Sequence, residues 1–70
     1  MKLGIYRHFK GNHYRVLGMA RHSETLEEMV IYARVEHPDD VWVRPITMFS
    51  EKVQKDGVTF DRFEFVGEQI

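Results

Sequence analysis

Apolar and polar residues alternate over most of this chain, as they do in β-strands that bury one side. In the first such stretch, Ile5 and Phe9 share one side of the strand. The other side carries Tyr6, His8 and Lys10. We therefore expect a strand whose two apolar residues face the core, while the three polar side chains face solvent.

Three further stretches have the composition of strands, at residues 14–21, 41–44 and 62–66. Gly18 in the first of them indicates a bend or bulge, because small sheets often curl at a strand glycine. Turn signals separate the stretches and stand at residues 10–12, 37–40 and 55–57. Before the last stretch, a single helical or 3-10 turn is predicted by the spacing of Ile46, Phe49 and Val53.

Residues 23–36 fit two structures. Thr25-x-x-Glu28 is a helical capping box. Four apolar residues recur there at helical spacing: Leu26, Met29, Val30 and Ala33. The same segment is rich in residues that favour strands, namely Val30, Ile31, Tyr32 and Val35. Periodicity alone leaves both structures open.

Packing favours the strand. Four strands of this length make an open sheet with two exposed edges and one bare face. A fifth strand over residues 28–35 allows the sheet to close on its apolar side without a helix. We therefore expect an all-β, mainly β fold: a small five-stranded SH3-like barrel with a 3-10 turn before the last strand. Residues 1–70 are expected to form this single domain.

Composition narrows the class of protein. The 70 residues are 43% hydrophobic and 30% charged, as in a folded globular domain. The absence of cysteine excludes a disulfide scaffold, a thiolate zinc site and a cysteine nucleophile. No apolar run approaches the roughly 18 residues of a membrane span. Because Met1-Lys2-Leu3 leads straight into patterned sequence, we expect no targeting segment and a cytoplasmic location.

The charges are unevenly distributed. The net charge is −1, which weighs against a protein held to duplex DNA mainly by phosphate contacts. The first 22 residues nevertheless contain five basic residues and no acidic one. One interpretation is a basic surface; the other is that the two halves of the chain attract each other within one fold.

Several motifs follow one another along the chain: Gly4-x-Tyr6-x-His8-x-Lys10-Gly11, then Tyr14-x-Val16-x-Gly18-x-Ala20-x-His22-x-Glu24-Thr25, then Val30-x-Tyr32, then Trp42-x-Arg44-Pro45-x-x-Met48-Phe49. In this order the chain resembles domain-of-unknown-function family 1653, from about Gly4 to Val66. The resemblance implies an architecture like that of small SH3-like barrels and no assigned activity. Phe9 stands where the family often has tyrosine, so a hydroxyl role there is not implied.

The row of Tyr6, His8 and Lys10 is the first candidate site. A phenol, an imidazole and an ammonium on one strand face form a strip that can meet a carboxylate, a phosphate or a base. The alternative is the solvated face of an edge strand, where lysine discourages pairing with other sheets.

His22, Glu24 and Thr25 form the second candidate, in a loop at the end of a strand. A histidine two residues from a glutamate can be oriented by it and act as a general base. The alternative is local hydrogen bonding between side chains and backbone in a tight turn.

Trp42 and Arg44 form the third candidate, on the side of their strand opposite Val41 and Val43, which we expect to face the core. A tryptophan beside an arginine near a proline suits an aromatic groove for a peptide or a flat ring. The alternative is that Trp42 covers one end of the barrel.

The sequence favours binding over catalysis. The four histidines lie on different predicted elements, so we expect no metal and no cofactor. We expect a small non-catalytic binding module that recognises a peptide or protein partner through a polar and aromatic surface, with no membrane association. The alternative is a barrel that binds single-stranded nucleic acid through the basic, aromatic-interleaved N-terminal strands. The ligand and the oligomeric state stay open.

Overall fold

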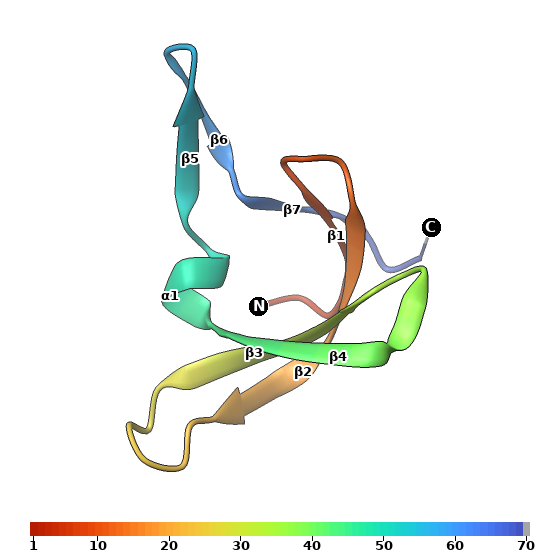
Figure 1. Ribbon diagram of the computed structural model, residues 1–70, viewed down its shortest axis with the longest axis vertical. Coiled ribbons are helices and arrows are strands. Elements are labelled where there is room, and N and C mark those ends of the chain that lie inside the picture. The colour runs from red at the N-terminus through yellow and green to blue at the C-terminus, as the bar shows by residue number, and fades with distance from the viewer. Residues whose placement is uncertain (70) are drawn as a thin grey trace.

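The computed structural model describes residues 1–69 and is mainly β (Figure 1). Seven strands and one short helix follow one another within these residues. In chain order they are β1 (Gly4–His8), β2 (His13–Arg21), β3 (Glu28–Arg34), β4 (His37–Pro45), α1 (Ile46–Phe49), β5 (Lys52–Lys55), β6 (Val58–Asp61) and β7 (Phe63–Gly67).

Five of the strands form one antiparallel sheet in the order β4-β3-β2-β1-β7. β5 and β6 pair only with each other and form a hairpin that projects away from the sheet (Figure 1). Within residues 1–69 no ladder joins β4 to β7, so the sheet has two free edges and is not closed by pairing. The all-β expectation is confirmed, whereas the count of five strands is wrong.

The ambiguous segment is a strand. β3 pairs with β2 and with β4 on its two sides, so Tyr32 lies opposite both Val16 and Trp42. Its β-branched and aromatic residues pack well on a pleated surface, and two ladders satisfy its backbone. The strand is therefore confirmed, and the helical alternative for this segment is wrong. The register shift between Val16 and Gly18 is the expected bulge.

Two elements differ from the expectation. β4 begins at His37 rather than at residue 41, and it contains Pro38 near its start. An edge strand tolerates proline there, because an amide on the outer side of the strand would donate to no neighbouring strand. The predicted turn at 55–57 is flanked by two short strands; Asp56 and Gly57 both have positive φ, at 53° and 79°, as a tight hairpin turn requires.

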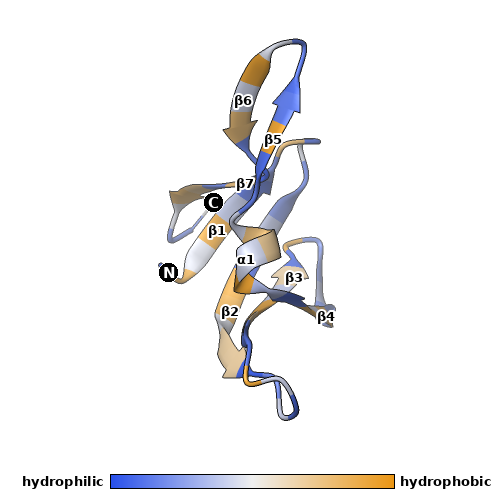
Figure 2. Ribbon diagram, turned by 90° about the vertical axis from the view of Figure 1, so that its left-hand side faces the viewer, coloured by the Kyte–Doolittle hydropathy of each residue, from blue (hydrophilic) through white to orange (hydrophobic). Residues whose placement is uncertain are grey.

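The core lies on one face of the sheet and is mostly aromatic. Phe49 of α1, 1% exposed, stacks on Phe63 of β7 with ring centres 4.1 Å apart. Tyr6 and Tyr32 meet the Phe49 ring edge-on, each at 5.5 Å. Val16 and Val30 complete the cluster. Figure 2 shows apolar residues on β1, β2 and α1, and a mainly polar β5.

For two strands, the prediction of which side chains face the core is wrong. Tyr6 is only 7% exposed, and its hydroxyl donates to the carbonyl of Lys2 at 2.7 Å. It belongs to the core because its ring packs edge-on against Phe49 and Phe65, and β1 is flanked by β2 and β7. Val41 and Val43 are 50% and 60% exposed, because the core with Phe49 and Phe63 lies on the opposite face of the sheet. On that face Arg44 lies over the Phe63 ring.

Candidate functional site

Five side chains from β2, β3 and β4 line an open cleft of about 260 Å³ on the core-bearing face of the sheet. We call it the tyrosine–arginine cleft, and its residues are Tyr14, Tyr32, Arg34, Trp42 and Arg44. Tyr32 is buried at its base, Tyr14, Arg34 and Arg44 are half-buried, and Trp42 is 52% exposed at its rim.

The strand register brings these residues together. Tyr14 lies opposite Arg34, and Tyr32 lies opposite Trp42. Arg44 follows Trp42 by two residues and therefore points to the same face. The cleft is thus built on three rigid, mutually paired strands, which hold its groups in place before any ligand arrives.

Arg44 is held by two contacts. Its Nε donates to the hydroxyl of Tyr32 at 3.3 Å, and its guanidinium lies 5.7 Å from the centre of the Phe63 ring. Within residues 1–69 neither Arg44 nor Arg34 forms an ion pair with a carboxylate. The cleft therefore carries two cations that no acidic side chain of the described chain neutralises.

His8 lies beside the cleft. Its ring centre is 4.9 Å from that of Phe63 and 6.2 Å from that of Tyr14. Burial lowers the pKa of this imidazole, and the positive charges of Arg62, Arg44 and Lys10 lower it further, so the ring is neutral at pH 7. Because Nδ1 accepts from the Lys10 amide at 3.2 Å, the proton of the neutral ring resides on Nε2, which is a donor.

The structure separates the three predicted groups. Trp42 and Arg44 lie in the cleft, His8 lies next to it, and Tyr6 lies beneath the surface. Lys10 is exposed in the turn after β1.

His22, Glu24 and Thr25 lie in the loop between β2 and β3, at the opposite end of that hairpin from the cleft (Figure 1). The Nδ1 atom of His22 accepts from the amides of Glu24 and Thr25, at 3.1 and 3.3 Å. These bonds are the local turn bonding that was the alternative for this motif. Within residues 1–69 no side-chain hydrogen bond joins His22 to Glu24.

Sequence reasoning missed Tyr14, Tyr32 and Arg34 as cleft residues. The signal was present, because Tyr32 and Arg34 are two residues apart and so share a strand face. Pairing that strand with residues 14–21 in a hairpin places Tyr14 beside them. The missing step was the register, which alternation within one strand does not supply.

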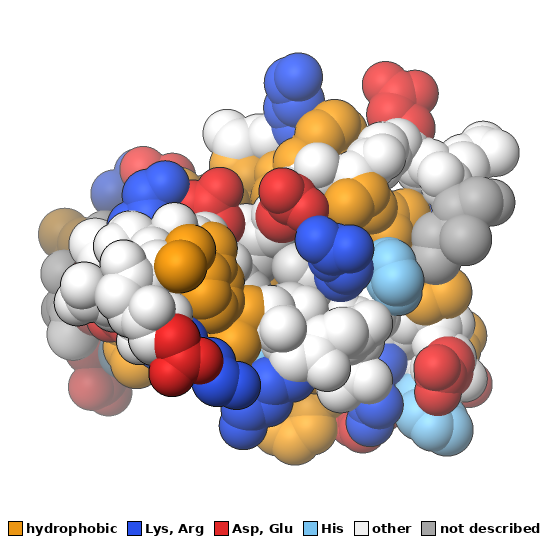
Figure 3. Space-filling model, turned by 90° about the horizontal axis from the view of Figure 1, so that it is seen from above, with side chains coloured by type: hydrophobic (Ala, Val, Ile, Leu, Met, Phe, Trp, Pro, Cys, Tyr) orange, Lys and Arg blue, Asp and Glu red, His pale blue; other side chains and the backbone are white. Residues whose placement is uncertain are grey.

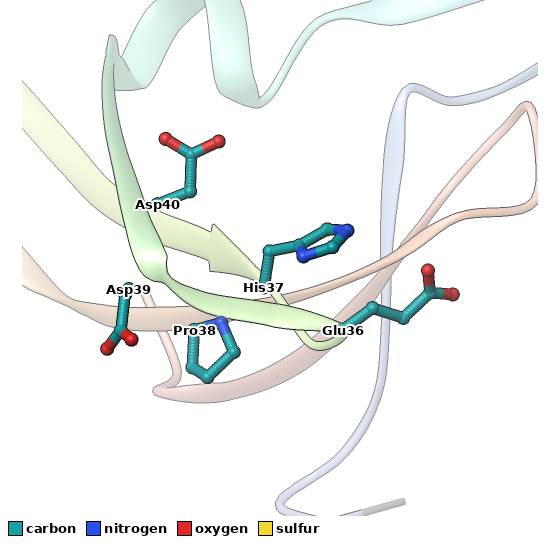
Figure 4. A pocket seen from close by; sticks show the side chains of 5 residues that line it. All are labelled: Glu36, His37, Pro38, Asp39 and Asp40. Carbon is teal, nitrogen blue, oxygen red and sulfur yellow. The ribbon is translucent and has the colours of Figure 1, made fainter.

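Another hollow lies on the turn between β3 and β4, with a volume of about 400 Å³ (Figure 4). Its lining includes three acidic residues, but the side chains of Glu36, Asp39 and Asp40 point in different directions (Figure 4). Among residues 1–69 no group of histidine and acidic side chains is arranged to hold a metal ion. Its lining contains no phenylalanine, tyrosine or tryptophan, so it is the weaker candidate for a ligand site.

In the described residues, no helix has the length and apolar character needed to cross a membrane.

Comparison with known proteins gives a family and a fold. The family model described as "Protein of unknown function (DUF1653)" matches residues 4–65. A crystal structure of a protein belonging to that family from Bordetella bronchiseptica is similar, with a TM-score of 0.86 and 36% sequence identity. The alignment covers 97% of this chain and 90% of that one. No curated protein matches the chain.

Proposed function

We propose that this chain, which belongs to the DUF1653 family of proteins of unknown function, is a non-catalytic module that binds a peptide segment of a protein partner. One observation carries the proposal: the tyrosine–arginine cleft sets an exposed tryptophan beside two arginines that no carboxylate of residues 1–69 neutralises. The chemistry of these groups indicates the class of ligand.

The arginines favour a carboxylate. A guanidinium presents a planar fork of donors that matches the two oxygens of Asp or Glu, and such charge-assisted bonds are stronger than neutral ones. Within residues 1–69 the Nε of Arg44 is already engaged by Tyr32, and its two terminal nitrogens make no hydrogen bond. They remain available to a ligand oxygen.

The ring of Trp42 favours a flat or cyclic neighbour of that carboxylate. Exposed tryptophans commonly hold proline or aromatic side chains of extended peptides. We therefore propose a ligand segment in which Asp or Glu stands next to proline, phenylalanine or tyrosine. The openness of the cleft supports binding over catalysis, because acid–base chemistry on a small domain needs a site that excludes water.

We also propose that the fold is a partly open relative of the SH3-like barrel. Two features support this. The strands β1 to β4 form a meander, and the last strand returns to pair with β1, giving the order β4-β3-β2-β1-β7. A short helix, α1, precedes the return, and its Phe49 packs between Tyr32 of β3 and Phe63 of β7. The β5–β6 hairpin is then an insertion between the helix and the last strand.

The binding proposal is tested with fluorescein-labelled peptides that place Asp or Glu beside Pro, Phe or Tyr. Matched peptides carry Asn or Gln instead of the acid. We expect anisotropy to rise with the acidic peptides, and Trp42→Ala to weaken binding about tenfold or more. Val41→Ala is the control, because Val41 is as exposed as Trp42 but lies on the opposite face.

Two results contradict the proposal. One is the absence of binding by every acidic peptide up to about 1 mM, which corresponds to roughly −4 kcal/mol. The other is equal binding of the acidic and the amide peptides, which would mean that the arginines do not recognise a carboxylate of the ligand.

Single-stranded nucleic acid is the second candidate, because the same exposed ring and cations suit base stacking and phosphate contact. The N-terminal basic residues support it less than the sequence indicates. Arg7 is paired with Glu64 at 3.0 Å, and Arg15 lies on the sheet face opposite the cleft. On the face that Figure 3 shows, side chains of both signs are interspersed. Binding of a short RNA that weakens steeply with salt, together with no peptide binding, would favour this candidate.

A further inference from the structure

β4 is an edge strand with exposed apolar side chains on both faces. Val41, Trp42 and Val43 are 50%, 52% and 60% exposed, although they are consecutive residues of a strand. β4 pairs only with β3, so its outer side presents unpaired backbone donors and acceptors.

Natural edges are commonly protected by proline, charges or bulges. Here Pro38 and Pro45 stand at the two ends of β4, and a register shift precedes Val41. The two prolines therefore limit the part of β4 that can pair with another strand to the residues between them. This arrangement suits a short ladder with one partner rather than extended sheet growth.

We propose that β4 pairs antiparallel with β4 of a second copy of this chain, about a two-fold axis through Trp42. A two-fold axis perpendicular to the sheet makes residue pairs whose numbers add to a constant, and keeps each sheet face on the same side in both copies. This proposal does not rest on the ligand of the cleft, but the contact engages Trp42 and Arg44, so we expect a second copy and a peptide to compete for these side chains.

The register centred on Trp42 places complementary groups opposite each other. Val41 of one copy meets Val43 of the other, and the two Trp42 rings meet at the axis. Asp40 meets Arg44 of the other copy, twice by symmetry. Asp39 and Asp40 point to opposite sides of β4 (Figure 4), so alternation places Asp40 on the side of Trp42 and Arg44.

Neighbouring symmetric registers lack this match. A centre at Val41 places Asp40 opposite Trp42 and Pro38 opposite Arg44. A centre at Asp40 places two carboxylates opposite each other, which is repulsive. A centre at Val43 gives Trp42 opposite Arg44 but leaves Asp40 opposite Ile46, beyond the end of the strand. Charge complementarity therefore selects the register centred on Trp42.

The paired segment is short, so the dimer is expected to be weak and reversible, in the class of interfaces below about 1,200 Å². The first test is sedimentation equilibrium on the purified full chain without peptide, over a range of concentrations. We expect Asp40→Arg to weaken association about tenfold or more, and the double variant Asp40→Arg, Arg44→Asp to restore it. Asp39→Arg is the matched control, since it makes the same charge change on the opposite face.

The second test uses the absence of cysteine from the sequence. Trp42→Cys places two thiols opposite each other at the axis, about 4.5–5.5 Å apart between Cα atoms, within the range a disulfide spans. We expect mild oxidation to link this variant into a dimer, and Val43→Cys to stay unlinked because it faces Val41 of the other copy. A chain that stays monomeric at every concentration overturns the proposal. Linking of Val43→Cys but not of Trp42→Cys overturns the register.

Discussion

At the scale of single residues, His8 shows how a partly buried imidazole becomes a neutral donor beside the cleft. Burial and three neighbouring cations lower its pKa from 6.5. The unfolded chain therefore binds this proton more readily than the folded chain, so the free energy of unfolding rises with pH where His8 titrates. The contribution is fully present above about 6.5, the unfolded pKa, and is lost as the pH falls toward the lower folded value.

His8→Gln removes this dependence. We expect the free energy of unfolding of the native chain to fall more between pH 7.5 and 5.5 than that of the variant, as measured by urea titration at each pH. His13→Gln is the control, because His13 is an exposed residue at the start of β2. Parallel curves for the native chain and His8→Gln would show that His8 does not contribute to the pH dependence.

Residues also show where alternation fails as a guide. It correctly places Tyr6 and His8 on one face and Ile5 on the other. It does not say which face is buried, and here both are: Ile5 is 0% exposed and Tyr6 is 7% exposed. β1 lies between β2 and β7, and its first three residues are buried; alternation within one strand reveals neither the neighbouring strands nor the burial.

At the scale of elements, local signals were sufficient where strand formers and turn residues agree. They predicted β1, β2, α1 and β7 close to their observed bounds, whereas β3 was predicted from packing because the local signals left a helix open. They failed for the β5–β6 hairpin, whose Lys-Val-Gln-Lys and Val-Thr-Phe-Asp segments are too short and polar to stand out. The candidate site was predicted only for Trp42 and Arg44, because its other members come from β2 and β3 and depend on register.

The β5–β6 hairpin depends on its turn. Gly57 has a φ of +79°, a conformation that costs a residue with a side chain about 1–2 kcal/mol. We expect Gly57→Ala to speed amide hydrogen exchange in residues 52–61 and to leave the five-stranded sheet intact, since the hairpin pairs only with itself. Gly18→Ala is the control, because it stands in open space without positive φ. Equal exchange in the two variants would contradict a turn-limited hairpin.

At the scale of the whole molecule, the N-terminal and C-terminal halves of the chain stabilise each other through contacts between them. The basic first half and the acidic second half meet along β1 and β7, where Arg7 pairs with Glu64 at 3.0 Å. Both side chains are about half exposed, so this pair is worth at most about 1 kcal/mol. The larger link is apolar, because β7 and α1 supply Phe63 and Phe49 to a core whose other members come from β1, β2 and β3.

Phe49 is therefore expected to decide whether the molecule folds. Its ring contacts Tyr6, Tyr32 and Phe63. Within residues 1–69 no backbone ladder joins β4 to β7, so these side-chain contacts connect the two ends of the sheet. Truncating a buried phenylalanine costs about 3–5 kcal/mol. A 70-residue domain has about 3.5–10 kcal/mol in all, at roughly 0.05–0.15 kcal/mol per residue.

Phe49→Ala should thus lower the melting temperature sharply or leave the chain largely unfolded at 25 °C, as followed by far-ultraviolet circular dichroism. Met48→Ala, the neighbouring residue in α1 and 47% exposed, should change the melting temperature little. Comparable losses in the two variants would mean that helix formation itself, and not the aromatic stack, holds α1 against the sheet. The stack explains the difference between them, because only Phe49 reaches both β3 and β7.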